Sequence, residues 1–176
     1  MSEHEDKRSL SEDIFYPDHE RTESLTFSAT KRAGHKQGLP CMISGNTEVE
    51  YHHSFCEYAF QLGVDWAVVK GIATGSITEL PKLDLHTDQP IPGETFQAKD
   101  SMLWLLCKMA ELRGFDWEKF DPAKPELFVD SLSHMWPLHE KFHRAKDHGI
   151  HKLSFPLWSF QALPRVAGFV FTPDEK

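Results

Sequence analysis

The sequence has few cysteines, no long apolar run and a shortage of positive charge, and each shortage excludes a class of protein. Three widely spaced cysteines among 176 residues, Cys41, Cys56 and Cys107, do not make a disulfide framework. No apolar run approaches the roughly 20 residues that span a bilayer. The charged start MSEHEDKRSL lacks the apolar stretch of a signal peptide. We therefore expect a soluble cytoplasmic protein with no membrane partner.

Charge is unevenly distributed along the chain. The 19 Lys and Arg residues against 27 Asp and Glu residues give a net charge of −8, which repels phosphate at long range and disfavours a simple nucleic-acid coat. Residues 1–20 hold seven acids against two bases, so they contribute −5 of this total. We predict an acidic, flexible arm over residues 1–24 and a single domain over residues 25–176. The 40% hydrophobic residues are enough for a core.

Short β-prone runs and one helical pattern occupy the first third of this domain. The runs CMISG and TEVEYHH, separated by Gly45 and Asn46, predict a β-hairpin over residues 41–53. In the next segment Phe55, Tyr58 and Leu62 recur at helical spacing, and Gly63 is a plausible stop. The expected order of elements is therefore β, β, α.

The rest of the chain favours helices. Residues 68–98 are broken by glycine and proline, which predicts a connector with one strand. A helix is expected from about residue 101, capped by Asp100 or Ser101 and ended by Gly114, and a short helix is expected after Pro125. Residues 137–149 predict a further helix of about three turns. The fold class that follows is α+β.

Histidine is the residue type in excess. Of 11 histidines, His52 and His53 are adjacent, and five more fall within 18 residues: His134, His139, His143, His148 and His151. Imidazole is a common metal ligand and acid–base group, so such clusters raise the prospect of a metal or catalytic site. At a strand end, one ring of an adjacent pair can bind a metal while its neighbour acts as a general base on water. His139 and His143 share one face of the predicted helix.

These segments resemble the HNH endonuclease superfamily. The resemblance rests on CMISGNTEVEYHH followed by a helix, and on SHMWPLHEKFHRAKDHGIH with the FPLW after it, which look like a phage- or prophage-associated branch. It covers about residues 40–66 and 128–160. It implies a ββα-metal core, in which a β-hairpin and a helix hold a divalent metal, with a mostly helical insertion at about residues 67–127. It also places the protein in a bacterial host cell.

The resemblance implies a role for each matching residue. His52 stands at the first metal-ligand position and His53 at the general-base position, while His143 stands at the last metal-ligand position on the helix. His134 stands where the family has its middle Asn, which makes it a candidate both for catalysis and for metal binding. Arg144 is placed to contact the scissile phosphate.

Two further residues are candidates beside this set. Glu57 is a possible partner that would orient an imidazole. His151 could be a further site residue or a phosphate contact.

The metal expected is Mg²⁺, Mn²⁺, Zn²⁺ or Ni²⁺. A shell rich in histidine and poor in carboxylate favours Zn²⁺, Ni²⁺ or Mn²⁺ by ligand softness, whereas the family keeps Mg²⁺ open. Many relatives also carry a structural zinc with four Cys or His ligands. The four matching positions here are Cys41, Ser44, His139 and Phe142, of which only two can bind zinc, so we expect no structural zinc.

Two functions from different classes follow. The first is a metal-dependent endonuclease that hydrolyses DNA phosphodiester bonds. The second is a catalytically inactive HNH-like phage protein that inhibits a host defence complex by binding protein, for instance as a DNA mimic, which the net charge of −8 suits. A structural metal-binding module is a weaker third. The acidity does not exclude DNA, because residues 137–161 carry a net charge of +2 from Lys141, Arg144, Lys146 and Lys152 against Glu140 and Asp147.

Overall fold

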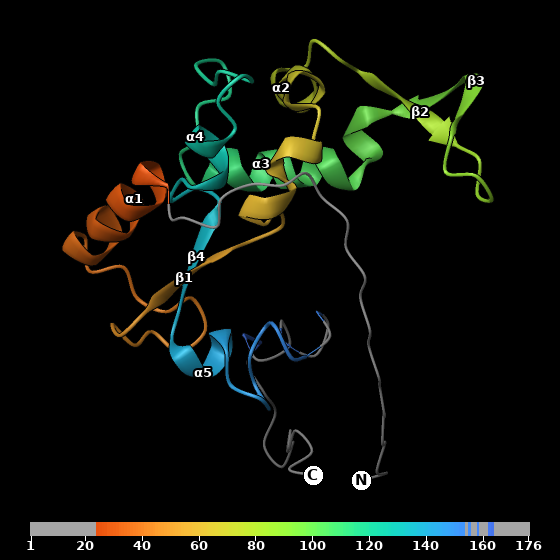
Figure 1. Ribbon diagram of the computed structural model, residues 1–176. Helices are drawn as coiled ribbons and strands as arrows, with labels where there is room; N and C mark the ends of the chain where they lie inside the picture. Colours follow the sequence, from red (N-terminus) through yellow and green to blue (C-terminus); the bar gives the residue numbers. More distant parts are fainter. Residues whose placement is uncertain (1–23, 154, 156–157, 159–161, 164–176) are drawn as a thin grey trace, which may run out of the picture.

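The computed structural model describes residues 24–153, 155, 158, 162 and 163 (Figure 1). The predicted acidic arm lies almost wholly outside these residues. The fold is α+β, as predicted, with helices and two small antiparallel sheets. Within the described part of the chain, no helix has both the length and the apolar character needed to cross a bilayer.

The central feature is a pair of strands from distant parts of the chain. β1 (Glu50–His53) pairs antiparallel with β4 (Met135–Leu138), so that His52 lies opposite Trp136. The predicted hairpin over residues 41–53 is therefore wrong in its first strand. Residues 41–46 form a turn instead, in which the Cys41 N–H donates to the Asn46 carbonyl at 2.7 Å. β1 finds its partner through long-range pairing, which no local pattern encodes.

The hydrophobic core lies beside this sheet, within the segment that connects its strands. Phe128, on α4 (Glu126–Val129), is completely buried and stands at the centre of an aromatic cluster. Its ring lies 4.7 to 5.7 Å from those of Trp66, Phe115 and Trp117. α2 (Trp66–Thr74) and α3 (Met102–Leu112) pack against each other around it. This core fixes residues 128–135, and with them the start of β4.

The helices of this segment follow the predictions only in part. α3 begins where expected, since the Ser101 hydroxyl accepts from the Trp104 N–H at 3.1 Å, and α4 follows Pro125 as predicted. The helix expected after His53 is instead a 3₁₀ helix, η1 (Tyr58–Gly63). Residues 68–98 hold most of α2 and two strands, β2 (Glu79–Leu83) and β3 (Pro90–Gln97), rather than a connector with one strand. A short 3₁₀ helix, η2 (Ala98–Asp100), leads into α3.

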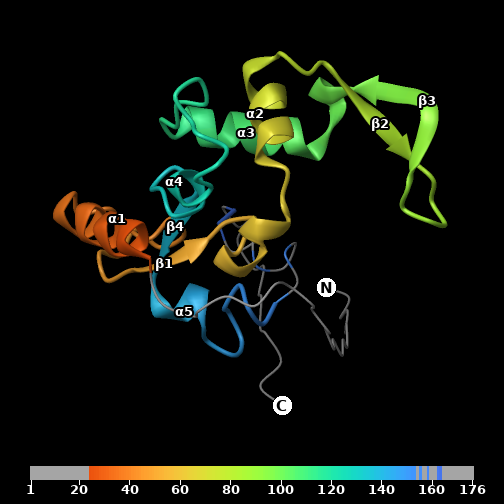
Figure 2. The same cartoon turned by 45° about the horizontal axis from the view of Figure 1, so that its top comes forward.

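The two sheets lie apart. β2 and β3 form an exposed arm that projects from one end of the molecule, and Figure 2 shows the same arm from a second direction. α1 (Leu25–Lys36) lies on the other side, near β1 and α4. α5 (Glu140–His143) follows β4 directly and is one turn long, so the predicted three-turn helix is wrong in length. Residues 137 and 138 belong to β4, and the helix ends at His143 with Arg144 as its C-cap.

Candidate metal centre

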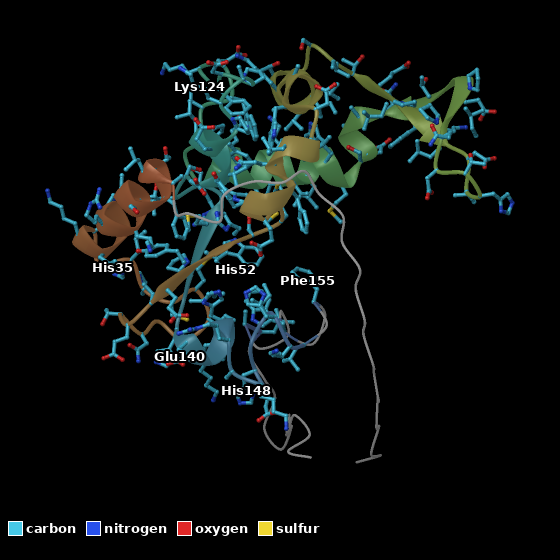
Figure 3. All side chains as sticks on the ribbon, viewed as in Figure 1. His35, His52, Lys124, Glu140, His148 and Phe155 are labelled. Carbon is cyan, nitrogen blue, oxygen red and sulfur yellow. The ribbon has the colours of Figure 1, made fainter. Side chains whose placement is uncertain are left out.

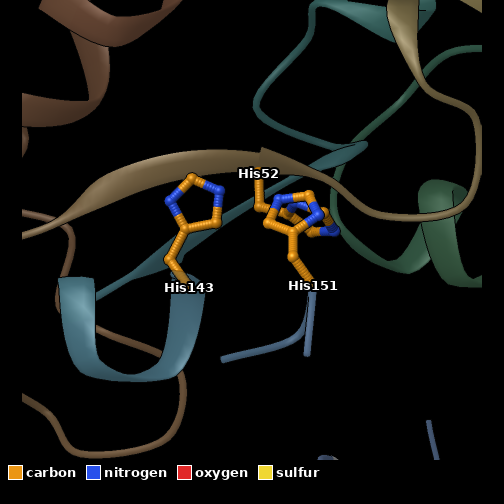
Figure 4. A group of neighbouring side chains, drawn as sticks. All are labelled: His52, His143 and His151. Atoms are coloured by element: carbon orange, nitrogen blue, oxygen red, sulfur yellow. The ribbon is translucent and has the colours of Figure 1, made fainter. Parts of the chain in front are cut away.

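Three histidines converge beside β1. His52 comes from β1, His143 from α5 and His151 from the chain after α5, and Figure 4 shows the three rings gathered beside β1. Their ring centroids are 4.8 to 5.3 Å apart, and one nitrogen of each ring lies within 4.8 Å of the others. Among the described residues this is the one group of His, Cys, Asp and Glu side chains that could hold a metal ion.

Local structure explains why the rings meet. β4 runs antiparallel to β1 and leads straight into α5, which brings His143 back to the strand that carries His52. Figure 3 shows His52 in the middle of the molecule. The chain then turns back at Gly149, whose N–H donates to the Ala145 carbonyl at 2.8 Å. A Cβ on Gly149 would lie only 2.8 Å from the His143 carbonyl, so the turn that returns His151 to the group requires glycine.

A carboxylate orients His143. The Nδ1 of His143 lies 2.6 Å from Glu50 Oε2, which leaves Nε2 as the nitrogen available to a metal. Arg144 bonds to the other carboxylate oxygen of Glu50. Partial burial opposes ionisation of Glu50, but its hydrogen bonds with His143 and Arg144 lower the pKa of this carboxyl below its usual value. Glu50 therefore presents a charged acceptor to the ring of His143.

Two rings of the group, those of His52 and His151, favour the unprotonated form. Burial and repulsion from His151 and His143, opposed by Glu57, lower the pKa of His52 to about 4. Burial and the neighbouring His143 also lower the pKa of His151. Since a metal binds only neutral imidazole, these rings need not lose a proton at neutral pH before they coordinate one.

His53, the next residue of β1, is not a member of this group and is held by two carboxylates. Its Nε2 lies 2.9 Å from Asp130 Oδ1, and its Nδ1 lies 3.5 Å from Glu57 Oε2. Burial lowers the pKa of His53, but Asp130 and Glu57 outweigh it and raise the pKa to about 9. Glu57 also lies 4.0 Å from the Nδ1 of His52, so it stands between the two adjacent histidines. The predicted orienting role of Glu57 agrees with this position.

His134 has a different place from the one predicted. It is completely buried, and both ring nitrogens are engaged. Its Nδ1 donates to the Val129 carbonyl at 2.7 Å, and its Nε2 accepts from the backbone N–H groups of Phe55 and Cys56 at 3.4 and 3.3 Å. With no nitrogen left for a metal, His134 instead ties the loop after β1 to the segment before β4. The third histidine of the group is His151.

We expect His134 to make the metal-free protein sensitive to acid. Burial, with repulsion from His53 and Arg113, lowers the pKa of His134 to about 4, although the Val129 carbonyl opposes the shift. The native state thus resists a proton that the unfolded chain accepts near its usual pKa of about 6.5. The stability that this difference in the pKa of His134 contributes is complete above about pH 6.5 and is lost as the pH falls toward 4. Its loss between about pH 7 and pH 5 is about 2 kcal/mol.

Urea unfolding in EDTA at the two pH values measures this loss. His134→Asn has no titrating group, so it should be less stable at neutral pH but should lose about 2 kcal/mol less on acidification. Equal acid sensitivity in both proteins would contradict this account of His134.

The four positions matched to a structural zinc carry other contacts. Cys41 is buried; burial raises the pKa of its thiol, but hydrogen bonds from the backbone of His139 and from Ser44 outweigh this and lower it. His139 caps α5, since its Nδ1 accepts from the Lys141 N–H at 3.1 Å. The expected absence of a structural zinc stays a prediction.

Comparison of the chain with family models, with curated proteins and with solved structures found no match. The geometry of the three histidines and the sequence motifs are therefore the indications of function in this chain. Sequence reasoning missed Asp130, which belongs to no motif and reaches His53 only through the fold. It named His151 only as a further candidate, although the His-rich spacing of residues 134–151 was a usable signal.

Proposed function

We propose that this chain is a metal-dependent endonuclease of the HNH type that hydrolyses DNA phosphodiester bonds. One observation carries the proposal: three imidazoles meet at the junction of β1 and α5, and the next residue of β1 is a histidine held by two carboxylates. This arrangement combines a candidate metal centre with a candidate general base. It agrees with the sequence resemblance, which pairs His52 with His53 in the same two roles.

In this proposal β1, β4 and α5 form the ββα-metal core. The two strands are antiparallel and the helix follows the second strand, which is the order that the resemblance implies. The insertion then lies between the strands, over residues 54–134, rather than between a finished hairpin and the helix. His134, at the position of the family's middle Asn, acts through backbone hydrogen bonds on the loop that follows His53.

The residues fit a divalent metal. His52, His143 and His151 would supply three nitrogen ligands and leave a position open, as catalytic metal centres do. The ion would neutralise phosphate charge and stabilise the leaving oxygen. Neutral imidazole ligands favour Zn²⁺, Ni²⁺ or Mn²⁺, whereas the resemblance keeps Mg²⁺ in consideration.

His53 is the proposed general base. Without metal its ring is paired with Asp130 and Glu57, which favour the protonated form. A divalent ion held by the adjoining histidines would oppose this protonation, so that the ring of His53 could release its proton and accept one from the attacking water. The nearby Glu57 carboxylate is a partner for water on the same side of the ring.

Basic side chains near the site suit a phosphate backbone. Arg144, whose side chain is 57% exposed, is held beside the centre by Glu50, and the predicted phosphate contact of Arg144 stays a prediction. α1, whose Phe27 stacks on His53, carries Lys31, Arg32 and Lys36 and no acidic residue. These charges favour DNA near the centre despite the acidity of the whole chain.

Cleavage of supercoiled plasmid tests the proposal. We expect nicking or linearisation with one or more of Mn²⁺, Mg²⁺, Zn²⁺ and Ni²⁺, and no cleavage in EDTA. His86→Ala, which removes an exposed histidine in the loop between β2 and β3, is a matched control that should cleave normally. If the protein binds metal but cleaves plasmid with none of these four metals, the proposal of a nuclease is overturned. Capture of a protein partner by such an inactive chain would favour the inhibitor.

A further inference from the structure

A buried carboxylate stands behind the proposed base. Asp130 ends α4, and its side chain is completely inaccessible to solvent. A buried charge is costly unless it is fully hydrogen-bonded. Both oxygens of Asp130 are used: Oδ1 bonds to His53 Nε2 at 2.9 Å, and Oδ2 accepts from the Ser24 hydroxyl at 2.5 Å. These contacts join three segments that are far apart in the sequence.

The ring of His53 is fixed in one orientation by its surroundings. Phe27 stacks on it, with ring centroids 5.3 Å apart and planes inclined by 22°. His134 lies beside it, with centroids 6.0 Å apart and planes inclined by 41°. Nε2 thus faces the buried Asp130, whereas Nδ1 faces Glu57, which also contacts His52. Only Nδ1 lies toward the metal-binding histidines.

We propose that Asp130 is a positioning residue that holds His53 as the Nε2–H tautomer, so that Nδ1 presents its lone pair to the attacking water. The proposal rests on the proposed function. Because a carboxylate only accepts hydrogen bonds, the 2.9 Å bond to Asp130 requires a hydrogen on Nε2, whereas Glu57 lies 3.5 Å from Nδ1, beyond the usual N–H···O distance. The arrangement follows the logic of the Asp–His pair in serine proteases, where a buried Asp sets the tautomer of the base.

This tautomer serves the hydrolysis of the phosphodiester bond by water. The water oxygen forms a bond to phosphorus while its proton passes to Nδ1 of His53, and the bond from phosphorus to the leaving sugar oxygen breaks. The leaving oxygen takes a proton from solvent, and His53 later returns its extra proton to solvent. Asp130 keeps its hydrogen bond to Nε2–H and stabilises the imidazolium that forms for part of the cycle.

Ser24 supports the same carboxylate. It is the N-cap of α1, where its hydroxyl oxygen accepts from the Phe27 N–H at 2.8 Å and its hydrogen goes to Asp130. This single side chain therefore fixes Asp130 and also the start of the helix that places Phe27 on His53. Loss of the Ser24 hydroxyl removes one of the two side-chain hydrogen bonds to Asp130 and leaves the bond to His53.

Asp130→Asn is the decisive variant, because it keeps the shape and removes the charge. We expect kcat for plasmid cleavage to fall by about 10²- to 10⁴-fold, while KM and Zn²⁺ affinity change by less than about twofold. Ser24→Ala should lower kcat by less than about tenfold. Wild-type kcat in Asp130→Asn, or a parallel loss of Zn²⁺ affinity, would overturn the positioning role.

A second readout does not depend on activity. Long-range ¹H–¹⁵N spectra of histidine-labelled protein, recorded at alkaline pH where the neutral ring is populated, report the tautomer of His53. We expect Nε2–H in the wild type and a shift toward Nδ1–H in Asp130→Asn. An Nδ1–H tautomer in the wild type would overturn the proposal even if the variant does not fold. If the wild type shows Nε2–H but cleaves nothing, the proposed function fails and the assignment of Asp130 as the group that sets the tautomer stands.

Discussion

Replacement of His53 by alanine is expected to lower kcat for phosphodiester cleavage by about a thousandfold. Loss of a general base costs about 10²- to 10⁴-fold, and His53 is the histidine that lies next to the candidate metal-binding group without belonging to it. Since the three candidate ligands stay in place, metal affinity should change little. Steady-state cleavage with saturating metal, together with calorimetric metal titration, measures both effects.

The control for this prediction is a histidine far from the centre. His86→Ala removes an exposed imidazole on the β2–β3 arm and should keep wild-type kcat. Rates within about threefold of wild type for His53→Ala would show that this ring is not the base. An equal loss of metal affinity would instead place His53 among the ligands.

Replacement of His143 by alanine is expected to lower metal affinity by more than about a hundredfold and to abolish cleavage. A residue that only orients a ligand costs about 10- to 100-fold when removed, and removal of the ligand itself should cost more. Glu50→Gln provides the graded comparison, because it weakens the 2.6 Å contact to His143 Nδ1 and keeps the ring. The loss of metal affinity in Glu50→Gln should lie between about 10- and 100-fold. Zn²⁺ titration of the purified variants gives the order.

The same titration tests the third ligand. His151→Ala should weaken Zn²⁺ binding as strongly as His143→Ala, since both rings belong to the group. His134→Asn should leave Zn²⁺ affinity near wild type, because both nitrogens of His134 already have backbone partners. The reverse order would restore the sequence-based assignment of His134 as a ligand and remove His151.

The sequence pattern grouped three histidines that lie together in the fold, but it did not predict their surroundings. His52, His53 and His143 lie together as their motif positions suggested, because the adjacent pair belongs to one strand and His143 follows its partner strand closely. His134 and His151 were harder to place. Residues 134–151 contain five histidines, and only the burial of one and the turn at Gly149 decide which of them reaches the group.

The fold was predictable where the signals were local. Ser101 caps α3, and Pro125 precedes α4, as expected from capping and proline preferences. α2 was missed because Gly71 and Gly75 were interpreted as breaks. Gly75 is the C-cap with φ of 79°, and Gly71 lies inside the helix, where a Cβ would come within 2.6 Å of Ile77.

Long-range pairing was beyond the sequence patterns. The partner of β1 is β4, and the partner of His53 is Asp130, 77 positions away. Each contact depends on the aromatic core around Phe128, which folds the intervening segment back on itself. No spacing rule links two such residues, so they become neighbours only in the folded chain.

The most direct test of the metal centre is anomalous diffraction from crystals grown with Zn²⁺ or Mn²⁺. The account predicts one strong peak bound by nitrogens of His52, His143 and His151, with His53 unliganded beside it. A peak elsewhere with these three rings unliganded, or no peak at all in protein that cleaves DNA, would contradict it.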